Sequence, residues 1–175
     1  MNQPYELAAD YLSRKVGKTP EVGIICGSGL SGLSKVIENP FTVPYEEIPG
    51  FPAATVAGHV GELVFGIMQG VQVVCLRGRF HFYEGNDMPT VALPVRVMKL
   101  IGVKMLVVTN AAGGLNPGYE VGDIAVIQDH FGGVGIHDSL AHTSSASSKP
   151  SLTRISPLLP RYFLLCSPSW LETVH

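Results

Sequence analysis

The sequence predicts an α/β fold in which a mixed central β-sheet is flanked by helices. Apolar, β-branched runs alternate with glycine-rich turns and helical patterns, which is the order of elements in layered α/β proteins. A tight hairpin in the middle of the chain adds antiparallel strands to this arrangement. The chain has 175 residues and is 46% hydrophobic, so it can bury a substantial core in one domain.

Two segments show the spacing of apolar residues that is typical of helices. The first is expected to begin with a cap at Asn2 and to end at Gly17. The second is expected to begin at Asn86 or Asp87 and to end at Gly102.

Strands are expected at four apolar runs, with a hairpin before the second of them. The runs are 22–26, 71–76, 104–109 and 121–127, and the hairpin joins 62–68 to 71–76 through Gln69-Gly70. Residues 40–53 contain several prolines and are expected to be an irregular connection with at most one short edge strand.

Charge and composition favour a small-molecule partner. The net charge of -2 gives no basic field for nucleic acid, and no cluster of basic residues indicates a membrane surface. The N-terminus does not resemble a signal peptide, and no apolar run approaches the roughly 20 residues of a membrane span, so a cytoplasmic location is expected.

Neither the cysteines nor the tail histidines indicate a metal site. Cys26, Cys75 and Cys166 lie far apart in the sequence, and the first two fall in buried strands, so reduced core thiols are expected. The histidines of the tail lack compact ligand spacing, and no metal is expected.

Three predicted strands end in glycine-rich turns, after Cys26, Leu76 and Thr109. In open α/β sheets, ligands bind in the crevice outside the carboxyl ends of the strands. Glycines there allow backbone N–H groups to approach an anion, and the Ser28 hydroxyl adds a donor. We therefore expect the three ends to meet in one anion-binding crevice.

The segment Gly78 to Gly85 carries the polar side chains of this expected crevice. If the chain stays extended beyond Leu76, Arg79, His81 and Tyr83 share one face, whereas Phe80 and Phe82 share the other. A guanidinium fork, an imidazole and a phenol suit an oxyanion next to a hydroxylated group. The alternative is a solvated strand end anchored by the two phenylalanines.

A nicotinamide-binding site is a further alternative. Gly27, Gly29 and Gly32 satisfy the pattern G-x-G-x-x-G after a strand. The helix that should follow has only residues 30–37 before Pro40, which is short for a crossover helix.

Taken together, five motifs make the chain resemble the trimeric purine nucleoside phosphorylases. They are Gly27-Ser28-Gly29-Leu30, Gly58-His59-Val60-Gly61, 78–85 (Gly-Arg-Phe-His-Phe-Tyr-Glu-Gly), 109–116 (Thr-Asn-Ala-Ala-Gly-Gly-Leu-Asn) and Gly122-Asp123-Ile124. The resemblance covers residues 1–130, and the Asn-Ala-Ala-Gly-Gly run favours this branch over methylthioadenosine-type phosphorylases. Ser31 stands where many relatives have glycine, and Asn86 where an aromatic residue is familiar.

The resemblance implies a pentosyltransferase that splits inosine- or guanosine-type nucleosides with inorganic phosphate, releasing the purine and ribose 1-phosphate. Catalytic roles fall on Arg79 and His81, with His81 orienting the phosphate. The implied phosphate ligands are Ser28, His59, Arg79, His81 and the backbone of Ala111, and Tyr83 packs against the ribose. No cofactor or metal is implied, and phosphate is the co-substrate.

The resemblance also implies a homotrimer in purine salvage, and a second half that supplies the purine-binding residues and further strands. Residues 131–175 instead contain a polar, serine-rich tract at 143–151, which is typical of a poorly ordered tail and suggests an altered reading frame. Two hypotheses follow. The chain is a phosphorylase, or it is a catalytically inactive isoform that binds phosphate or joins full-length subunits.

Overall fold

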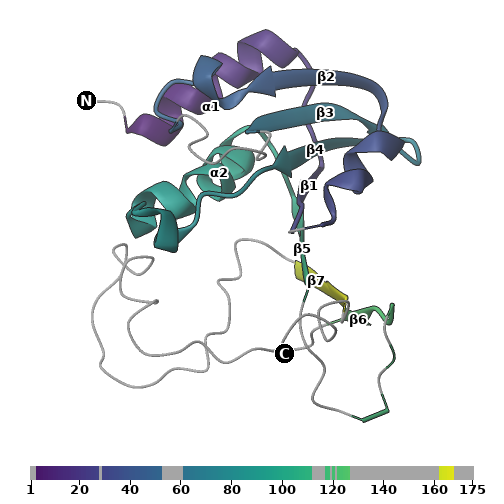
Figure 1. Cartoon of the computed structure of the whole chain (residues 1–175). Coiled ribbons are helices and arrows are strands. Elements are labelled where there is room, and N and C mark those ends of the chain that lie inside the picture. The colour runs from purple at the N-terminus through teal and green to yellow at the C-terminus, as the bar shows by residue number, and fades with distance from the viewer. Residues whose placement is uncertain are drawn as a thin grey trace, which may run out of the picture.

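The protein, seen in a computed structural model, forms a seven-stranded mixed sheet with both α-helices on one face (Figure 1). The structure describes residues 3–27, 29–52, 61–111, 117–118, 120, 122–126 and 162–167, the last range for its backbone alone. In chain order the elements are α1 (Pro4–Val16), β1 (Val22–Ile25), the 3-10 helix η1 (Ser31–Val36), β2 (Glu38–Pro44), η2 (Tyr45–Glu47), β3 (Glu62–Met68), β4 (Val71–Arg77), η3 (Phe82–Glu84), α2 (Met88–Leu100), β5 (Met105–Ala111), β6 (Ala125–Val126) and β7 (Tyr162–Ser167).

The strand order confirms the mixed sheet. The order is β2-β3-β4-β1-β5-β7-β6, in which β4, β1, β5 and β7 are parallel to their neighbours in this central run. The outer pairs β2–β3, β3–β4 and β6–β7 are antiparallel. The predicted hairpin is confirmed, because β3 and β4 are joined at Gln69-Gly70, where both residues have positive φ.

Both helices begin and end through local backbone chemistry. The N-cap of α1 is Gln3, in place of the expected Asn2, and Gly17 ends the helix with φ 66 and an N–H bond to Ser13. The N-cap of α2 is Asp87, whose carboxylate accepts a hydrogen bond from the N–H of Thr90 at 2.9 Å.

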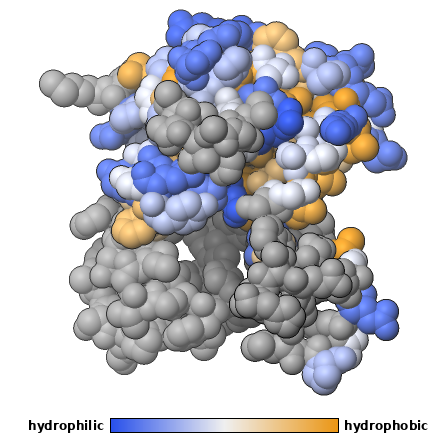
Figure 2. Space-filling model, viewed as in Figure 1, coloured by the Kyte–Doolittle hydropathy of each residue, from blue (hydrophilic) through white to orange (hydrophobic). Residues whose placement is uncertain are grey.

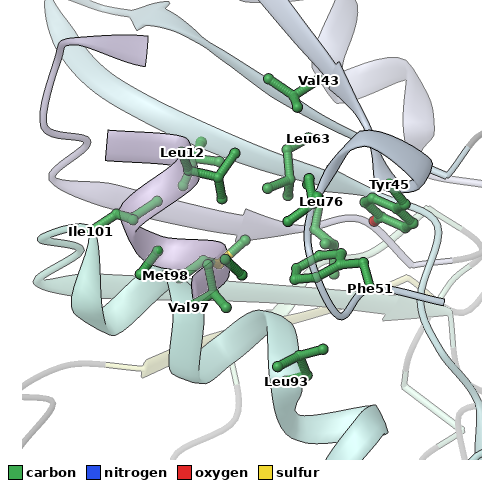
Figure 3. Packing of buried hydrophobic residues seen from close by; sticks show 14 of the residues in the cluster. Leu12, Val43, Tyr45, Phe51, Leu63, Leu76, Leu93, Val97, Met98 and Ile101 are labelled. Atoms are coloured by element: carbon green, nitrogen blue, oxygen red, sulfur yellow. The ribbon is translucent and has the colours of Figure 1, made fainter. Parts of the chain in front are cut away.

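The main hydrophobic core lies between the sheet and the two helices. Leu12 of α1 packs with Val97 and Met98 of α2, and all three are at most 1% exposed (Figure 3). Burial of an aliphatic side chain of this size contributes roughly 1.5 to 3 kcal/mol. The same cluster includes an aromatic group beside the sheet, Tyr45 and Phe51. This core fixes the face of the sheet on which α2 must lie.

The opposite face of the sheet carries a smaller cluster, made of Ile24, Cys26, Ile37, Val64, Val73 and Cys75. The Sγ atoms of Cys26 and Cys75 are 3.2 Å apart, and both thiols are buried and free, which confirms the prediction for this pair. Their mutual hydrogen bond lowers the pKa of Cys26 and raises that of Cys75. Ile37, directly after η1, covers this cluster.

Three strands differ from the expectations. Of the run 121–127, only Ala125–Val126 forms a strand, β6, among the described residues. β2 is a full seven-residue strand that contains Pro40 and Pro44, although residues 40–53 were expected to be mostly irregular. It lies at the sheet edge, where a missing N–H costs no ladder bond, and its register shifts between Glu38 and Phe41. β7 falls inside the polar tail and pairs with β5 through backbone groups.

Part of the apolar surface stays exposed. Figure 2 shows hydrophobic residues between hydrophilic ones on the right of the upper part of the molecule, the side on which Figure 1 draws η1. Leu33 and Val36 of η1 are among the exposed hydrophobic residues. Among the described residues, no helix is long and apolar enough to cross a membrane.

Removal of β7 should expose the edge of β5. A chain ending at residue 161 loses the parallel partner of Leu106 to Ala111, whereas a chain ending at residue 167 keeps it. We expect a lower unfolding midpoint and concentration-dependent association only for the shorter chain, because an open strand edge is a template for pairing. Thermal melts and light scattering on both chains measure this, and identical behaviour would refute it.

The stabilisation of α2 by its N-cap, Asp87, should depend on pH. The hydrogen bonds with Thr90 lower the pKa of Asp87 below 3.8, so its stabilising effect is present above that pH and is lost as the pH falls through the folded pKa. Asp87→Ala should therefore lower the unfolding midpoint at pH 7, and the gap to wild type should close toward pH 3. Asp87→Asn keeps an acceptor at the cap and should show a smaller gap at pH 7. A gap for Asp87→Ala that does not change with pH would contradict the cap.

Candidate functional site

The three glycine-bearing strand ends lie side by side at one edge of the sheet. Ile25, the last residue of β1, is in register with Leu76 of β4 and Val108 of β5. The N–H of Cys26 continues the pairing by donating to the carbonyl of Leu76 at 3.2 Å. The loops that follow β4, β1 and β5 therefore start from neighbouring positions, as the sequence predicted.

The connections after β1 and β4 leave toward opposite faces of the sheet. The chain after β1 runs through η1 to Ile37 in the smaller cluster, whereas the chain after β4 leads to α2 over the main core. Neighbouring parallel strands whose connections diverge open a crevice between their carboxyl ends. This is the topological position at which α/β proteins bind ligands.

Gly27 and Thr109 join the ends of β1 and β5. The N–H of Gly27 donates to the Thr109 hydroxyl at 2.9 Å, and that hydroxyl donates to the carbonyl of Ile25 at 3.0 Å. Thr109 is 1% exposed. A Cβ at position 27 would overlap the Thr109 carbonyl and lie 2.7 Å from Cα of Asn110, so only glycine fits. The predicted donor Ser28 follows directly, and it lies outside the described residues.

A buried aromatic group holds the start of the Arg79 segment. The Tyr45 hydroxyl donates to the carbonyl of Gly78 at 2.5 Å. Burial raises the pKa of Tyr45, which keeps the phenol protonated as a donor. The ring of Phe80 lies 5.2 Å from that of Tyr45 and 5.7 Å from that of Phe51. Arg79 is thus flanked by two fixed positions.

The chain does not stay extended beyond β4, so one prediction is wrong. Phe80 is buried, but Phe82 is 68% exposed and does not share its environment. Residues Phe82–Glu84 form a 3-10 turn that ends at Gly85 with φ 85. The turn forms because its polar groups are satisfied locally, and this outweighs the alternation of an extended strand.

His81 and Tyr83 nevertheless lie together. Their rings are stacked at 4.6 Å with an interplanar angle of 21°, and Tyr83 is 80% exposed. An exposed phenol beside a part-buried imidazole is available to a ligand from the solvent side.

Glu84 is a site residue that the sequence reasoning missed. Its Oε2 accepts from the N–H of His81 at 3.2 Å, and its Oε1 lies 3.1 Å from Nδ1 of His81. The two side chains are only 15% and 11% exposed. A carboxylate only accepts, so this contact is a hydrogen bond when the proton is on Nδ1, and it favours that tautomer. The spacing of three between His81 and Glu84 is that of a capping box and could have indicated this pair.

Of the other predicted site residues, the structure describes Arg79 and Ala111. Arg79 is half-buried and already engaged in an interaction, and Ala111 is the half-buried last residue of β5. His59 lies outside the described residues. Oδ1 of Asn110 is buried and has no partner within the described part of the chain, which leaves an acceptor at the end of β5.

The nicotinamide alternative does not fit the observed geometry. The segment after Gly29 is the six-residue 3-10 helix η1, not the longer α-helix whose N-terminus would face a pyrophosphate. In the described ranges, no group of three or more potential metal ligands gathers.

A mixed α/β sheet in which β4, β1 and β5 end side by side, with diverging connections after β1 and β4, places the chain among the α/β proteins that bind ligands at the carboxyl ends of their strands. A family model described as "Phosphorylase superfamily" matches residues 21–174. The chain belongs to this superfamily.

Its relatives among known proteins agree with one another. The chain is 49% identical over 135 residues to purine nucleoside phosphorylase 1 of Bacillus subtilis, covering 77% of this chain and 50% of that protein. It is 54% identical over 127 residues to a purine nucleoside phosphorylase of Anopheles gambiae, covering 73% of this chain and 36% of that protein. The chain therefore spans about half the length of the Bacillus subtilis protein and a smaller share of the Anopheles gambiae protein.

Solved structures give the same result for the fold. A purine nucleoside phosphorylase in complex with ribose-1-phosphate matches with a TM-score of 0.69 and 50% identity, covering 73% of this chain and 47% of that chain. The Schistosoma mansoni enzyme in complex with inosine matches with a TM-score of 0.68 and 48% identity, covering 73% and 44%. The predicted fold class and resemblance are confirmed.

Loss of the Thr109 hydroxyl should separate the ends of β1 and β5. Thr109→Val leaves the buried N–H of Gly27 without its acceptor, which costs about 1 to 3 kcal/mol. Thr109→Ser keeps the hydroxyl and should lose less than this. Urea unfolding of both variants measures the difference, and equal losses would show that the hydroxyl bridge does not matter.

Proposed function

We propose that this chain is a purine nucleoside phosphorylase that binds inorganic phosphate at the edge formed by β4, β1 and β5. The observation that carries the proposal is the packing of Gly27 against the backbone of Thr109 and Asn110, which brings the end of β1 against β5, beside the end of β4. The names of the relatives and the ligands of the solved structures support the same reaction.

The phosphate ligands in this proposal are the residues expected from the sequence. Ser28, His59, Arg79 and His81 donate from side chains and Ala111 from its backbone N–H. Each charge-assisted hydrogen bond to phosphate is worth about 1.5 to 3 kcal/mol. Tyr83, exposed beside His81, covers the ribose. The residues that bind the purine stay unassigned.

The reaction needs positioning more than proton transfer by the protein. A phosphate oxygen forms the new bond to C1′ while the bond from C1′ to the purine nitrogen breaks, and the base leaves with the electron pair and takes up a proton. Phosphate is already anionic, so His81 orients it without acting as a base. The negative charge of the phosphate stabilises the oxocarbenium-like sugar as the glycosidic bond breaks. No cofactor takes part in this proposal.

The proposal extends to the assembly and the setting that the resemblance implies. We propose a homotrimer in the cytoplasm that acts in purine salvage on inosine- or guanosine-type nucleosides. We also keep the division into residues 1–130, which carry the phosphate side, and residues 131–175 as a tail.

The second candidate is a chain that binds phosphate, or joins full-length subunits, without turnover. The observation that favours it is the coverage of the relatives, of which this chain spans about half.

Phosphate should protect the protein, and inosine should be split. With the intact chain, we expect millimolar orthophosphate to raise the unfolding midpoint and hypoxanthine to appear from inosine only when phosphate is present. A ligand at ten times its Kd stabilises by about 1.4 kcal/mol. Protection without hypoxanthine release would establish the second candidate, and neither effect would overturn both.

Arginine variants test the location of the phosphate. Arg79→Ala should weaken phosphate binding about ten- to a hundredfold, in line with the loss of charge-assisted bonds. Arg96→Ala is the matched control, because Arg96 is on α2 and its guanidinium lies over the ring of Tyr5 on α1. Calorimetric titration with orthophosphate measures both, and equal affinities would place the phosphate elsewhere.

A further inference from the structure

The loop after β4 contains a hydrogen-bond network that reaches one residue beyond the expected site. Nδ2 of Asn86 donates to the carbonyl of His81 at 3.1 Å and to Oε2 of Glu84 at 3.4 Å. Glu84 in turn contacts both the N–H and Nδ1 of His81. Asn86 therefore donates to both members of the His81–Glu84 pair.

The chemistry of this network gives each member one role. The Glu84 carboxylate faces the imidazole with Oε1 and the two N–H donors with Oε2, so its rotation is restricted. Asn86 supplies the donor that satisfies Oε2 from outside the turn. Because His81 and Glu84 are largely buried, water competes weakly for these bonds.

We propose that Asn86 is a positioning residue that fixes the ring orientation and tautomer of His81 through Glu84. The inference rests on the proposed phosphate site only in its functional consequence, since the network joins protein groups to one another. Position 86 is also where this chain departs from the family it resembles, in which an aromatic residue is familiar. An aromatic side chain has no amide NH₂ group, which in Asn86 donates to both acceptors.

The turn itself has other supports, so a shape role can be separated from a positioning role. Gly85 adopts the left-handed conformation, and the N–H groups of Glu84 and Gly85 bond to the carbonyls of His81 and Phe82. Loss of the Asn86 amide should therefore leave the turn folded while removing one donor from Glu84 Oε2 and one from the carbonyl of His81, which loosens the orientation of the pair.

Nitrogen-15 NMR of the histidine rings in the intact chain tests the proposal directly. In the wild type we expect the His81 signals of the neutral ring to show the proton on Nδ1, with the signals assigned by their loss in His81→Gln. Asn86→Ala should shift them toward a mixture of tautomers. Asn86→Asp, which puts a second carboxylate beside Glu84, should shift them further. Unchanged ring signals in both variants would overturn the inference.

Titration with orthophosphate gives the functional readout. Asn86→Ala should weaken phosphate binding about three- to tenfold, the effect of one lost hydrogen bond of typical net strength. Asp87→Ala is the control, because it removes the neighbouring cap of α2. It should lower the unfolding midpoint and leave the His81 signals and the phosphate affinity unchanged. If Asp87→Ala shifts the ring signals as much as Asn86→Ala, the role of Asn86 is merely structural.

The two proposals fail in different ways. If the wild type binds no phosphate, the proposed function is wrong, and the ring signals measured without phosphate still decide the role of Asn86. If the wild type binds phosphate and Asn86→Ala binds it equally well, the positioning role alone is wrong.

Discussion

The hydroxyl of Thr109 holds together the ends of the two strands on which the site depends. It accepts from Gly27 and donates to Ile25, and it is buried where water cannot replace either bond. The absence of a side chain at Gly27 lets the backbones of β1 and β5 approach at this point. Of the residues proposed to bind phosphate, Ser28 follows β1, Ala111 ends β5, and Arg79 and His81 follow the neighbouring β4.

Buried groups of the candidate site hold the backbone in place, and less buried groups are available to a ligand. Tyr45 and Thr109 are fully buried and hold backbone carbonyls in place. The groups suited to a ligand are His81 and Tyr83, which follow Gly78 in the chain. His81 is oriented by its contact with Glu84, and the two rings stack on each other. Preorganised donors are effective because they need no rearrangement when the anion arrives.

Periodicity and turn chemistry predicted most of the fold. The helix that ends at Gly17, the hairpin at Gln69-Gly70 and the strand that contains Thr109 follow from local signals, although this strand continues to Ala111. The neighbourhood of the three strand ends was predicted because parallel strands share an edge. It needed no knowledge of side-chain contacts.

The remaining features depend on contacts that no local pattern reveals. The length of β2 results from its edge position, which tolerates Pro40. The exposure of Phe82 results from a turn whose polar groups find partners at Glu84, and the role of Asn86 appears only when that network is seen. Alternation of side chains holds only while neighbouring strands supply the hydrogen bonds.

The pairing of β7 with β5 has a consequence for how this architecture can vary. The register from Leu106 opposite Tyr162 to Ala111 opposite Ser167 is made by main-chain groups, which every amino acid except proline provides in full. The place beside β5 therefore sets weak demands on the identity of whatever segment occupies it. A segment of different side chains could therefore complete the sheet at this position, provided that it is extended and keeps its main-chain donors and acceptors.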